Sequence, residues 1–65
     1  MKLEYRIKEC REKAGMSQEQ LSKTAGVSRA IISGLENGTI TVTTTKTLSK
    51  IASALGLKVS DIFLC

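Results

Sequence analysis

The sequence predicts a small all-α domain of five helices, and three observations favour this fold class. Of the 65 residues 42% are hydrophobic, but only one is Phe, one is Tyr and none is Trp, so the core must be aliphatic. No residue is Pro. The apolar residues recur at helical spacing, and glycines separate the resulting segments. A chain of this length has room for one domain, residues 1–65, which buries about 60% of its unfolded surface.

The first predicted helix runs from Leu3 to Ala14, and Gly15 ends it. Its apolar face is formed by Leu3, Ile7, Cys10 and Ala14. Cys10 and Cys65 do not have the spacing of a metal or redox site. We therefore expect Cys10 to act as a small hydrophobic residue on the apolar side of this helix.

Two short helices follow within residues 17–38, and Gly26 stands between them. A glycine at this point permits a left-handed backbone conformation that closes the first helix and turns the chain sharply. The residues that cap or end the two helices are Ser17 with Gln20 as a capping box, Ser28, and Asn37-Gly38. Apolar residues on both sides of Gly26 aim one face of each helix at the other.

The segment from Thr39 to Thr45 alternates β-branched residues, a pattern that by itself is typical of a strand. No partner strand is evident, so we interpret it as an extended loop that reaches a threonine N-cap, Thr43 or Thr44. The fourth helix then runs to Leu55, and Gly56 ends it. The residues that it buries are Leu48, Ile51, Ala52 and Leu55.

A fifth, short helix is expected to begin at a Ser60 cap and to contain residues 61–64. Before it, Leu57 and Val59 continue the apolar surface across a short connection. The whole chain is thereby assigned to helices and short loops, without an internal repeat.

Charge and hydropathy exclude some function classes. Ten Lys and Arg against six Asp and Glu give a formal net charge of +4, which suits an anionic partner. No apolar run approaches the roughly 18 residues of a membrane span, and the amino terminus lacks the apolar region of a signal peptide. We expect a cytoplasmic protein without membrane contact.

The sequence does not predict an enzyme. It contains no histidine, no cluster of Cys, Asp and Glu with the spacing of metal ligands, and no glycine-rich phosphate loop. A serine or cysteine without a neighbouring base is no nucleophile. We therefore expect neither catalysis nor a bound metal or cofactor.

The order and spacing of these segments resemble the helix-turn-helix proteins of the lambda-type phage repressors, the Cro proteins and the wider XRE family. The segments that carry the resemblance are 7–13, 15–18, the motif at about 17–38, 48–56 and 61–63. The resemblance implies a compact five-helix, lambda repressor-like DNA-binding domain. Its second motif helix, 28–36, would enter the major groove of double-stranded DNA.

Four residues of that helix are expected to contact bases. Arg29 can donate two hydrogen bonds to guanine O6 and N7, or can instead contact a phosphate or solvent, and Ala30 can meet a thymine methyl group. Ser33 and Gly34 lie one turn further on. The resemblance implies a base-contacting side chain at Gly34, where glycine has none, so we expect a short consensus or reliance on DNA shape. Alternatively, Gly34 lets the backbone approach DNA.

Other residues are expected to contact phosphates, namely Gln18, Ser28, Thr39 and Lys46. Gln18 opens the first helix of the motif, where its side chain and the terminal N–H groups can bind one phosphate together. Because Lys46 is the first positive charge after Gly38, we expect a shallow salt dependence. The resemblance further implies a structural salt bridge between Arg11 and Glu36.

These residues predict a sequence-specific transcriptional regulator of phage, prophage or bacterial origin, acting as a repressor on a two-fold symmetric operator. One helix reads few base pairs, so a homodimer with half-sites roughly 34 Å apart is expected. The candidate dimer interface comprises Leu57, Val59, Phe63 and Leu64. A simpler alternative is that these side chains cover the core.

A second hypothesis is a protein-interaction module with the same fold. It would be the antitoxin of a toxin-antitoxin pair, or an adaptor that binds RNA polymerase without an operator of its own. A second polypeptide that copurifies with the chain would favour this hypothesis over the repressor.

Overall fold

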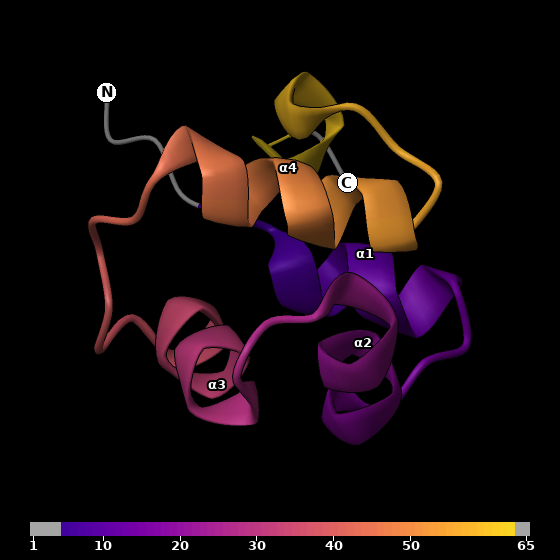
Figure 1. Cartoon of the computed structure of the whole chain (residues 1–65), viewed down its shortest axis with the longest axis horizontal. Coiled ribbons are helices and arrows are strands. Elements are labelled where there is room, and N and C mark those ends of the chain that lie inside the picture. Colours follow the sequence, from indigo (N-terminus) through magenta and orange to yellow (C-terminus); the bar gives the residue numbers. More distant parts are fainter. Residues whose placement is uncertain (1–4, 64–65) are drawn as a thin grey trace.

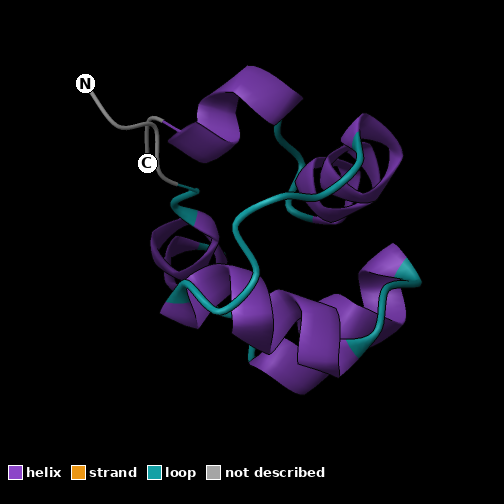
Figure 2. Cartoon of the chain, turned by 90° about the vertical axis from the view of Figure 1, so that its left-hand side faces the viewer, coloured by secondary structure: helices purple, strands orange, loops and turns teal. Residues whose placement is uncertain are grey.

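The computed structural model describes residues 5–63 of the chain, and all of its regular elements are helical. Figure 1 and Figure 2 show how short loops join them. The elements are α1 (Ile7–Lys13), α2 (Gln18–Ala25), α3 (Arg29–Asn37), α4 (Thr45–Ala54) and the 3₁₀ helix η1 (Val59–Phe63). The all-α class is therefore correct, but the prediction of five α-helices is not. Within residues 5–63 there are four, and the fifth element is a tighter 3₁₀ turn.

Helix α1 begins at Ile7, four residues later than the predicted start at Leu3, which lies outside the described residues. Arg6, the residue before the helix, has a non-helical backbone, and its N–H donates to the carbonyl of Ile62 at 2.8 Å. This bond ties the entry of α1 to η1. Ala14, predicted to face the core, is exposed at the carboxyl end of α1.

Helix α2 has the predicted capping box. The Ser17 hydroxyl accepts a hydrogen bond from the N–H of Gln20 at 3.1 Å, and the Gln20 side chain accepts one from the N–H of Ser17 at 2.8 Å. At the other end Gly26 has φ +68°, the left-handed conformation that turns the chain into α3. Local sequence signals therefore determine both ends of α2.

Helix α3 and the segment after it also follow local signals. Ser28 caps α3 by accepting from the N–H of Ala30 at 3.2 Å, and Gly38 ends it with φ +84°. The chain then forms a loop to α4, and the residues between them contain no strand. Thr44 is the N-cap of α4, because its hydroxyl accepts from the N–H of Thr47 at 3.1 Å.

The cap of the last element was predicted wrongly. Ser60 lies inside η1 and does not precede it. The carboxylate of Asp61 instead accepts from the N–H of Lys58 at 3.0 Å, which closes the turn one residue before η1.

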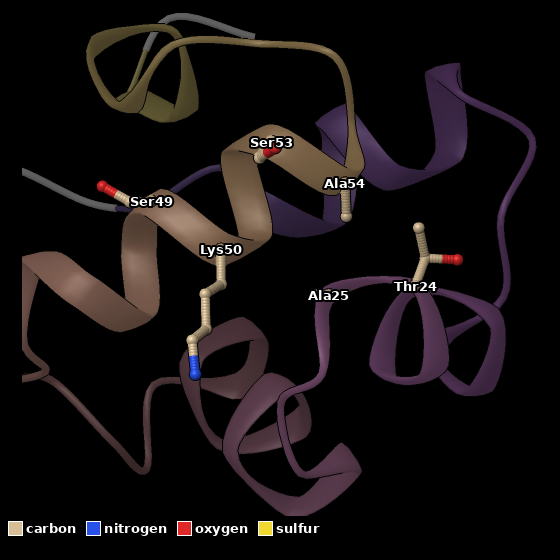
Figure 3. A pocket seen from close by; sticks show the side chains of 6 residues that line it. All are labelled: Thr24, Ala25, Ser49, Lys50, Ser53 and Ala54. Atoms are coloured by element: carbon tan, nitrogen blue, oxygen red, sulfur yellow. The ribbon is translucent and has the colours of Figure 1, made fainter.

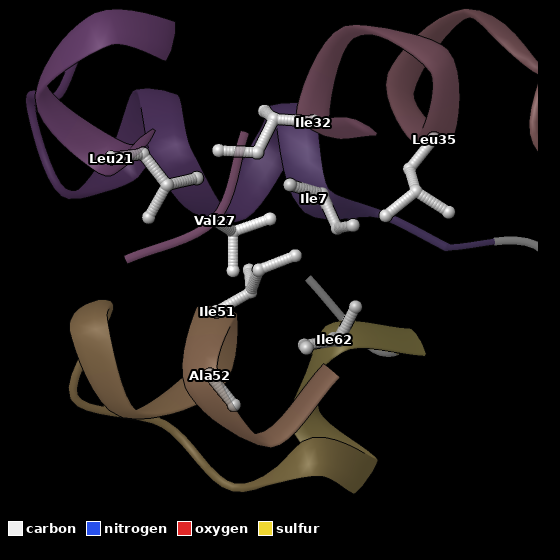
Figure 4. Close-up of a cluster of buried hydrophobic side chains, with 8 residues drawn as sticks. All are labelled: Ile7, Leu21, Val27, Ile32, Leu35, Ile51, Ala52 and Ile62. Atoms are coloured by element: carbon white, nitrogen blue, oxygen red, sulfur yellow. The ribbon is translucent and has the colours of Figure 1, made fainter. Parts of the chain in front are cut away.

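All five elements contribute to one aliphatic core (Figure 4). In Figure 1, α2 and α3 lie below α4, and η1 lies above it; α4 packs against α2 and η1, and α1 packs against α3 and η1. The core residues are Ile7, Leu21, Val27, Ile32, Leu35, Ile51, Ala52 and Ile62. Because both motif helices bury one face in this cluster, their opposite faces are held at a defined angle.

Cys10 is buried at 3% exposure, as its place on the apolar face of α1 predicts. Its sulfur lies 3.8 Å from the carbonyl oxygen of Asp61, so α1 meets η1 at this position.

Candidate nucleic-acid interface

The outward face of α3 is the candidate site for DNA. Arg29 and Ala30 are exposed on its first turn, and Ser33 is half-exposed one turn later. The opposite face carries Ile32 and Leu35, which are in the core. The predicted contact residues Arg29, Ala30 and Ser33 therefore lie on the same exposed strip, at the end of the helix that helix-turn-helix proteins direct at base edges.

The angle between α2 and α3 is held by a hydrogen bond that the sequence did not reveal. The Ser22 hydroxyl on α2 donates to the carbonyl of Val27 at 2.6 Å, across the turn at Gly26. A larger apolar residue at position 22 would remove this donor from the turn. Ser22 thus stabilises the turn by hydrogen bonding.

The ion pair between Arg11 and Glu36 is present, and it joins α1 to the last turn of α3. Arg11 Nε lies 2.9 Å from Glu36 Oε2, and Arg11 Nη2 lies 3.0 Å from Oε1. The third donor, Nη1, bonds the carbonyl of Met16 at 2.8 Å. The hydrogen bond to Glu36 raises the pKa of Arg11 above its already high ordinary value. Both side chains are largely buried, at 13% and 5% exposure.

Gln18 belongs to the same cluster. Its side-chain Nε2 donates to Glu36 Oε1 at 3.1 Å, so the first residue of α2 is bonded to the end of α3. The carboxylate of Glu36 therefore receives hydrogen bonds from both Arg11 and Gln18. The sequence analysis predicted only a phosphate contact for Gln18. Local sequence patterns do not reveal a contact between two residues 18 positions apart, such as Gln18 and Glu36.

The prediction that Gly34 contacts bases is wrong. Gly34 is buried, because the chain beyond α3 folds back and places Ile40 over it. The N–H of Ile40 donates to the Gly34 carbonyl at 2.9 Å, and a Cβ built on Gly34 would lie 2.5 Å from Ile40 Cδ1. Glycine is needed here for the close approach of the loop and not for an approach of DNA.

The residues predicted to contact phosphates lie before and after α3 in the sequence, and most of them are accessible to solvent. Ser28, Thr39 and Lys46 are exposed, and Gln18 is half-exposed. The Thr39 N–H donates to Asn37 Oδ1 at 2.9 Å, which fixes the backbone where the chain leaves α3. The hydroxyl of Thr39 takes no part in this hydrogen bond. The loop also exposes Val42, at 84%, which the sequence analysis did not single out.

The candidate dimer residues are engaged with their own chain. Val59 packs against the core, and the Phe63 ring lies 5.4 Å from the ring of Tyr5, centroid to centroid. Leu57 is half-buried, and Leu64 lies outside the described residues. Val59 and Phe63 are also half-buried, so each of the three described side chains keeps part of its surface accessible.

A shallow groove lies between the carboxyl end of α2 and α4 (Figure 3). Its lining consists of Thr24, Ala25, Ser49, Lys50, Ser53 and Ala54. Lys50 is the one titratable residue among them, so the groove has no pair of groups for acid–base chemistry.

The family model for helix-turn-helix proteins matches residues 7–62. The chain belongs to the XRE-type helix-turn-helix family of transcriptional regulators. The match extends from α1 to η1, so it covers all five elements and not only the motif.

Relatives of similar length support this membership. The chain is 34% identical over 61 residues to the uncharacterized HTH-type transcriptional regulator YgzD of Bacillus subtilis (strain 168), covering 94% of this chain and 91% of YgzD. It is 44% identical over 59 residues to an uncharacterized HTH-type transcriptional regulator of Archaeoglobus fulgidus, covering 91% and 82%.

Solved structures share the fold. The restriction-modification controller protein C.AhdI of Aeromonas hydrophila superposes with a TM-score of 0.82 at 33% identity, covering 89% of this chain and 86% of that protein. A complex of the SinR and SinI proteins contains a chain that superposes with a TM-score of 0.83 at 30% identity, covering 88% of this chain. This chain spans 55% of that SinR–SinI complex chain. Between residues 5 and 63, no helix has the length and hydropathy to cross a membrane.

Proposed function

We propose that this helix-turn-helix protein is a sequence-specific repressor that inserts α3 into the major groove of a two-fold symmetric operator. The observation that carries the proposal is the exposed strip at the start of α3, formed by Arg29, Ala30 and Ser33. The far end of α3 is fastened to α1 through Glu36. A rigidly held helix with exposed residues at its amino end has the geometry that direct readout requires.

Each residue of the strip has a chemical role in this proposal. Arg29 donates to O6 and N7 of a guanine, and Ala30 meets a thymine methyl group. Ser33 donates or accepts one hydrogen bond at the next base pair. Because Ile40 covers Gly34, these three side chains are the ones on α3 that we propose to contact bases. So small a set supports a short consensus in each half-site.

The phosphate contacts of the proposal lie at the amino end of α2. The capping box uses the N–H groups of Ser17 and Gln20, and Leu21 bonds back to Ser17. The amides of Gln18 and Glu19 then point out of the helix end towards a phosphate. Gln18 has a second side-chain N–H to add, because its bond to Glu36 uses one of two.

Ser28, Thr39 and Lys46 would extend the phosphate contacts along the backbone. The Ser28 hydroxyl accepts as a cap and still has its own proton to donate. Lys46 is exposed on the first turn of α4, directly after the loop. Few of these groups are charged, so a modest salt dependence is expected.

A homodimer through Leu57, Val59, Phe63 and Leu64 completes the proposal. Two copies would place two α3 helices in successive major grooves roughly 34 Å apart. Because Val59 and Phe63 also contact their own chain, we expect a weak dimer that forms mainly on DNA. We propose operators of bacterial or prophage genes as its targets.

Selection of bound sequences from a random duplex pool at near-physiological salt tests this function, with the wild type and Arg29→Ala side by side. We expect an inverted repeat with half-sites one turn apart, and loss of preference at one guanine in the variant. Absence of any enriched sequence from the folded wild type would overturn the proposal.

The second candidate, a protein-interaction module such as an antitoxin or an adaptor, is favoured by one observation. The SinR protein has been solved together with another protein, SinI. Purification of this chain from its source, followed by identification of any stoichiometric second polypeptide, distinguishes the two candidates. A partner that binds in place of DNA would favour the interaction module.

A further inference from the structure

We propose that Ile40, which lies in the loop after α3, reads a thymine in the operator. Residue 34 is a glycine and has no side chain. The side chain of Ile40 would occupy the place that is thereby left empty on the DNA-facing side of α3. This inference rests on the proposed function and specifies one further base contact for it.

The geometry begins at Gly34. A Cβ built on this residue would lie 2.5 Å from Ile40 Cδ1 and 2.6 Å from Ile40 Cγ1. The hydrogen bond from the Ile40 N–H to the Gly34 carbonyl, at 2.9 Å, fixes the loop in this position. The Ile40 side chain therefore fills the space into which a side chain of residue 34 would project.

The direction of that space points to DNA. Residues four positions apart lie on the same face of a helix, so position 34 projects on the same side as Ala30. Ala30 is exposed, and Ile40, which packs against the edge of the hydrophobic core, is half-buried. Ile40 thus continues the row that starts at Ala30, one helical turn further along α3, and part of its surface remains accessible.

The chemistry of the loop favours an apolar contact. Between Gly38 and Thr45 the chain carries no charged side chain. A branched aliphatic side chain cannot hydrogen-bond to a base edge, but it can bury the C5-methyl group of thymine, which is the apolar group of the major groove. Because χ1 of isoleucine is stiff, the loop presents this surface at little cost in conformational entropy.

Val42 offers a matched comparison. It is the most exposed large hydrophobic residue of the loop, at 84%, and it lies two residues beyond Ile40. Ile40 is held against α3 by its contact with Gly34, whereas the side chain of Val42 is almost fully exposed. The proposal therefore assigns methyl readout to Ile40 and none to Val42.

The test combines base analogues with protein variants. In the selected operator, each thymine of one half-site is replaced in turn by deoxyuridine, which lacks only the C5-methyl group. Binding of the wild type, Ile40→Ala and the control Val42→Ala is measured by fluorescence anisotropy. At one thymine we expect a loss of about fourfold for the wild type and for Val42→Ala, the factor that corresponds to about 0.8 kcal/mol for one buried methyl group.

For Ile40→Ala, the loss at that thymine should disappear. Ile40→Val is a second variant that keeps the branched side chain and removes only Cδ1, and it should show a reduced loss. Ala30→Gly should abolish the response at a different thymine, which separates the two residues. Unfolding curves of all variants show that each is folded at the assay temperature.

Two results would overturn the inference while leaving the regulator intact. Either no thymine responds to removal of its methyl group in the wild type, or every response of the wild type is unchanged in Ile40→Ala. Failure of the wild type to enrich any sequence in the preceding selection would instead remove the proposed function, and the assignment of Ile40 with it.

Discussion

The guanidinium of Arg11 and the carboxylate of Glu36 face each other in a two-point contact, Nε to Oε2 at 2.9 Å and Nη2 to Oε1 at 3.0 Å. The paired atoms are largely shielded from water. The contact joins α1 to the end of α3 and includes Gln18 from the start of α2. Three helices are thus connected through one carboxylate, which makes Glu36 the residue whose removal should disturb the motif most.

Glu36→Ala should lower the free energy of unfolding by about 3 kcal/mol, because the guanidinium of Arg11 is left buried without its counter-charge. Urea unfolding followed by circular dichroism measures the change. The matched control is Glu19→Ala, which breaks the pair between Lys23 and Glu19, exposed at 77% and 65%. That change should cost at most about 0.5 kcal/mol. Equal effects of the two variants would contradict a structural role for Glu36.

Gly34→Ala should destabilise the protein, although alanine is by itself the better helix former by about 1 kcal/mol. The new Cβ would collide with Ile40, and such overpacking costs about 1–3 kcal/mol. In an Ile40→Ala background the collision is absent, so the same substitution should stabilise the protein by about 1 kcal/mol.

Urea unfolding of both single variants and of the double variant tests whether the effect of Gly34→Ala on the free energy of unfolding changes sign. Ser49→Ala, at an exposed position of α4, serves as the control for helix propensity alone. A Gly34→Ala effect that is the same in the two backgrounds would show that Ile40 does not cover Gly34.

Ser17→Ala should cost about 1 kcal/mol of stability, because the capping box of α2 loses the acceptor for the N–H of Gln20. Ser17→Asp keeps an acceptor and adds a negative charge at the amino end of α2, so it should retain most of the stability. Thermal unfolding of the three proteins measures the difference. If Ser17→Asp were as unstable as Ser17→Ala, capping would not explain the effect.

The salt dependence of DNA binding tests the assignment of Lys46. Lys46→Ala should reduce the slope of log K against log salt by about 1 and should weaken binding to all sequences alike. Lys8→Ala makes the same charge change on α1, where no DNA contact is proposed, and should leave the slope unchanged. A change in sequence preference on loss of Lys46 would argue against a phosphate contact.

The sequence predicted those features of the fold that depend on neighbouring residues. The Ser17 and Gln20 box, the left-handed turn at Gly26 and the Thr44 cap each follow from residues within a few positions of one another. The pair of Arg11 with Glu36 spans 25 positions and was expected only from the family resemblance. The exposed strip of α3 followed from helical periodicity.

The features that were missed depend on the path of the loop or on contacts between distant segments. Nothing periodic in the Thr39–Thr45 segment shows that Ile40 returns to Gly34, so Gly34 was assigned to the DNA surface. The start of α1 was misplaced because it depends on the bond from Arg6 to Ile62. The last element is a 3₁₀ turn, which the hydrophobic pattern does not distinguish from a short α-helix.

The most direct test of the central claim, that α3 reads bases through Arg29, uses the selected operator with single guanines replaced by 7-deazaguanine. This analogue removes the N7 acceptor and keeps O6. At one guanine of the half-site, the substitution should weaken the wild type by about tenfold, since a bidentate contact contributes about 1–3 kcal/mol of discrimination. It should have little effect on Arg29→Ala. Equal losses in the two proteins, or no loss at any guanine, would contradict base readout by Arg29.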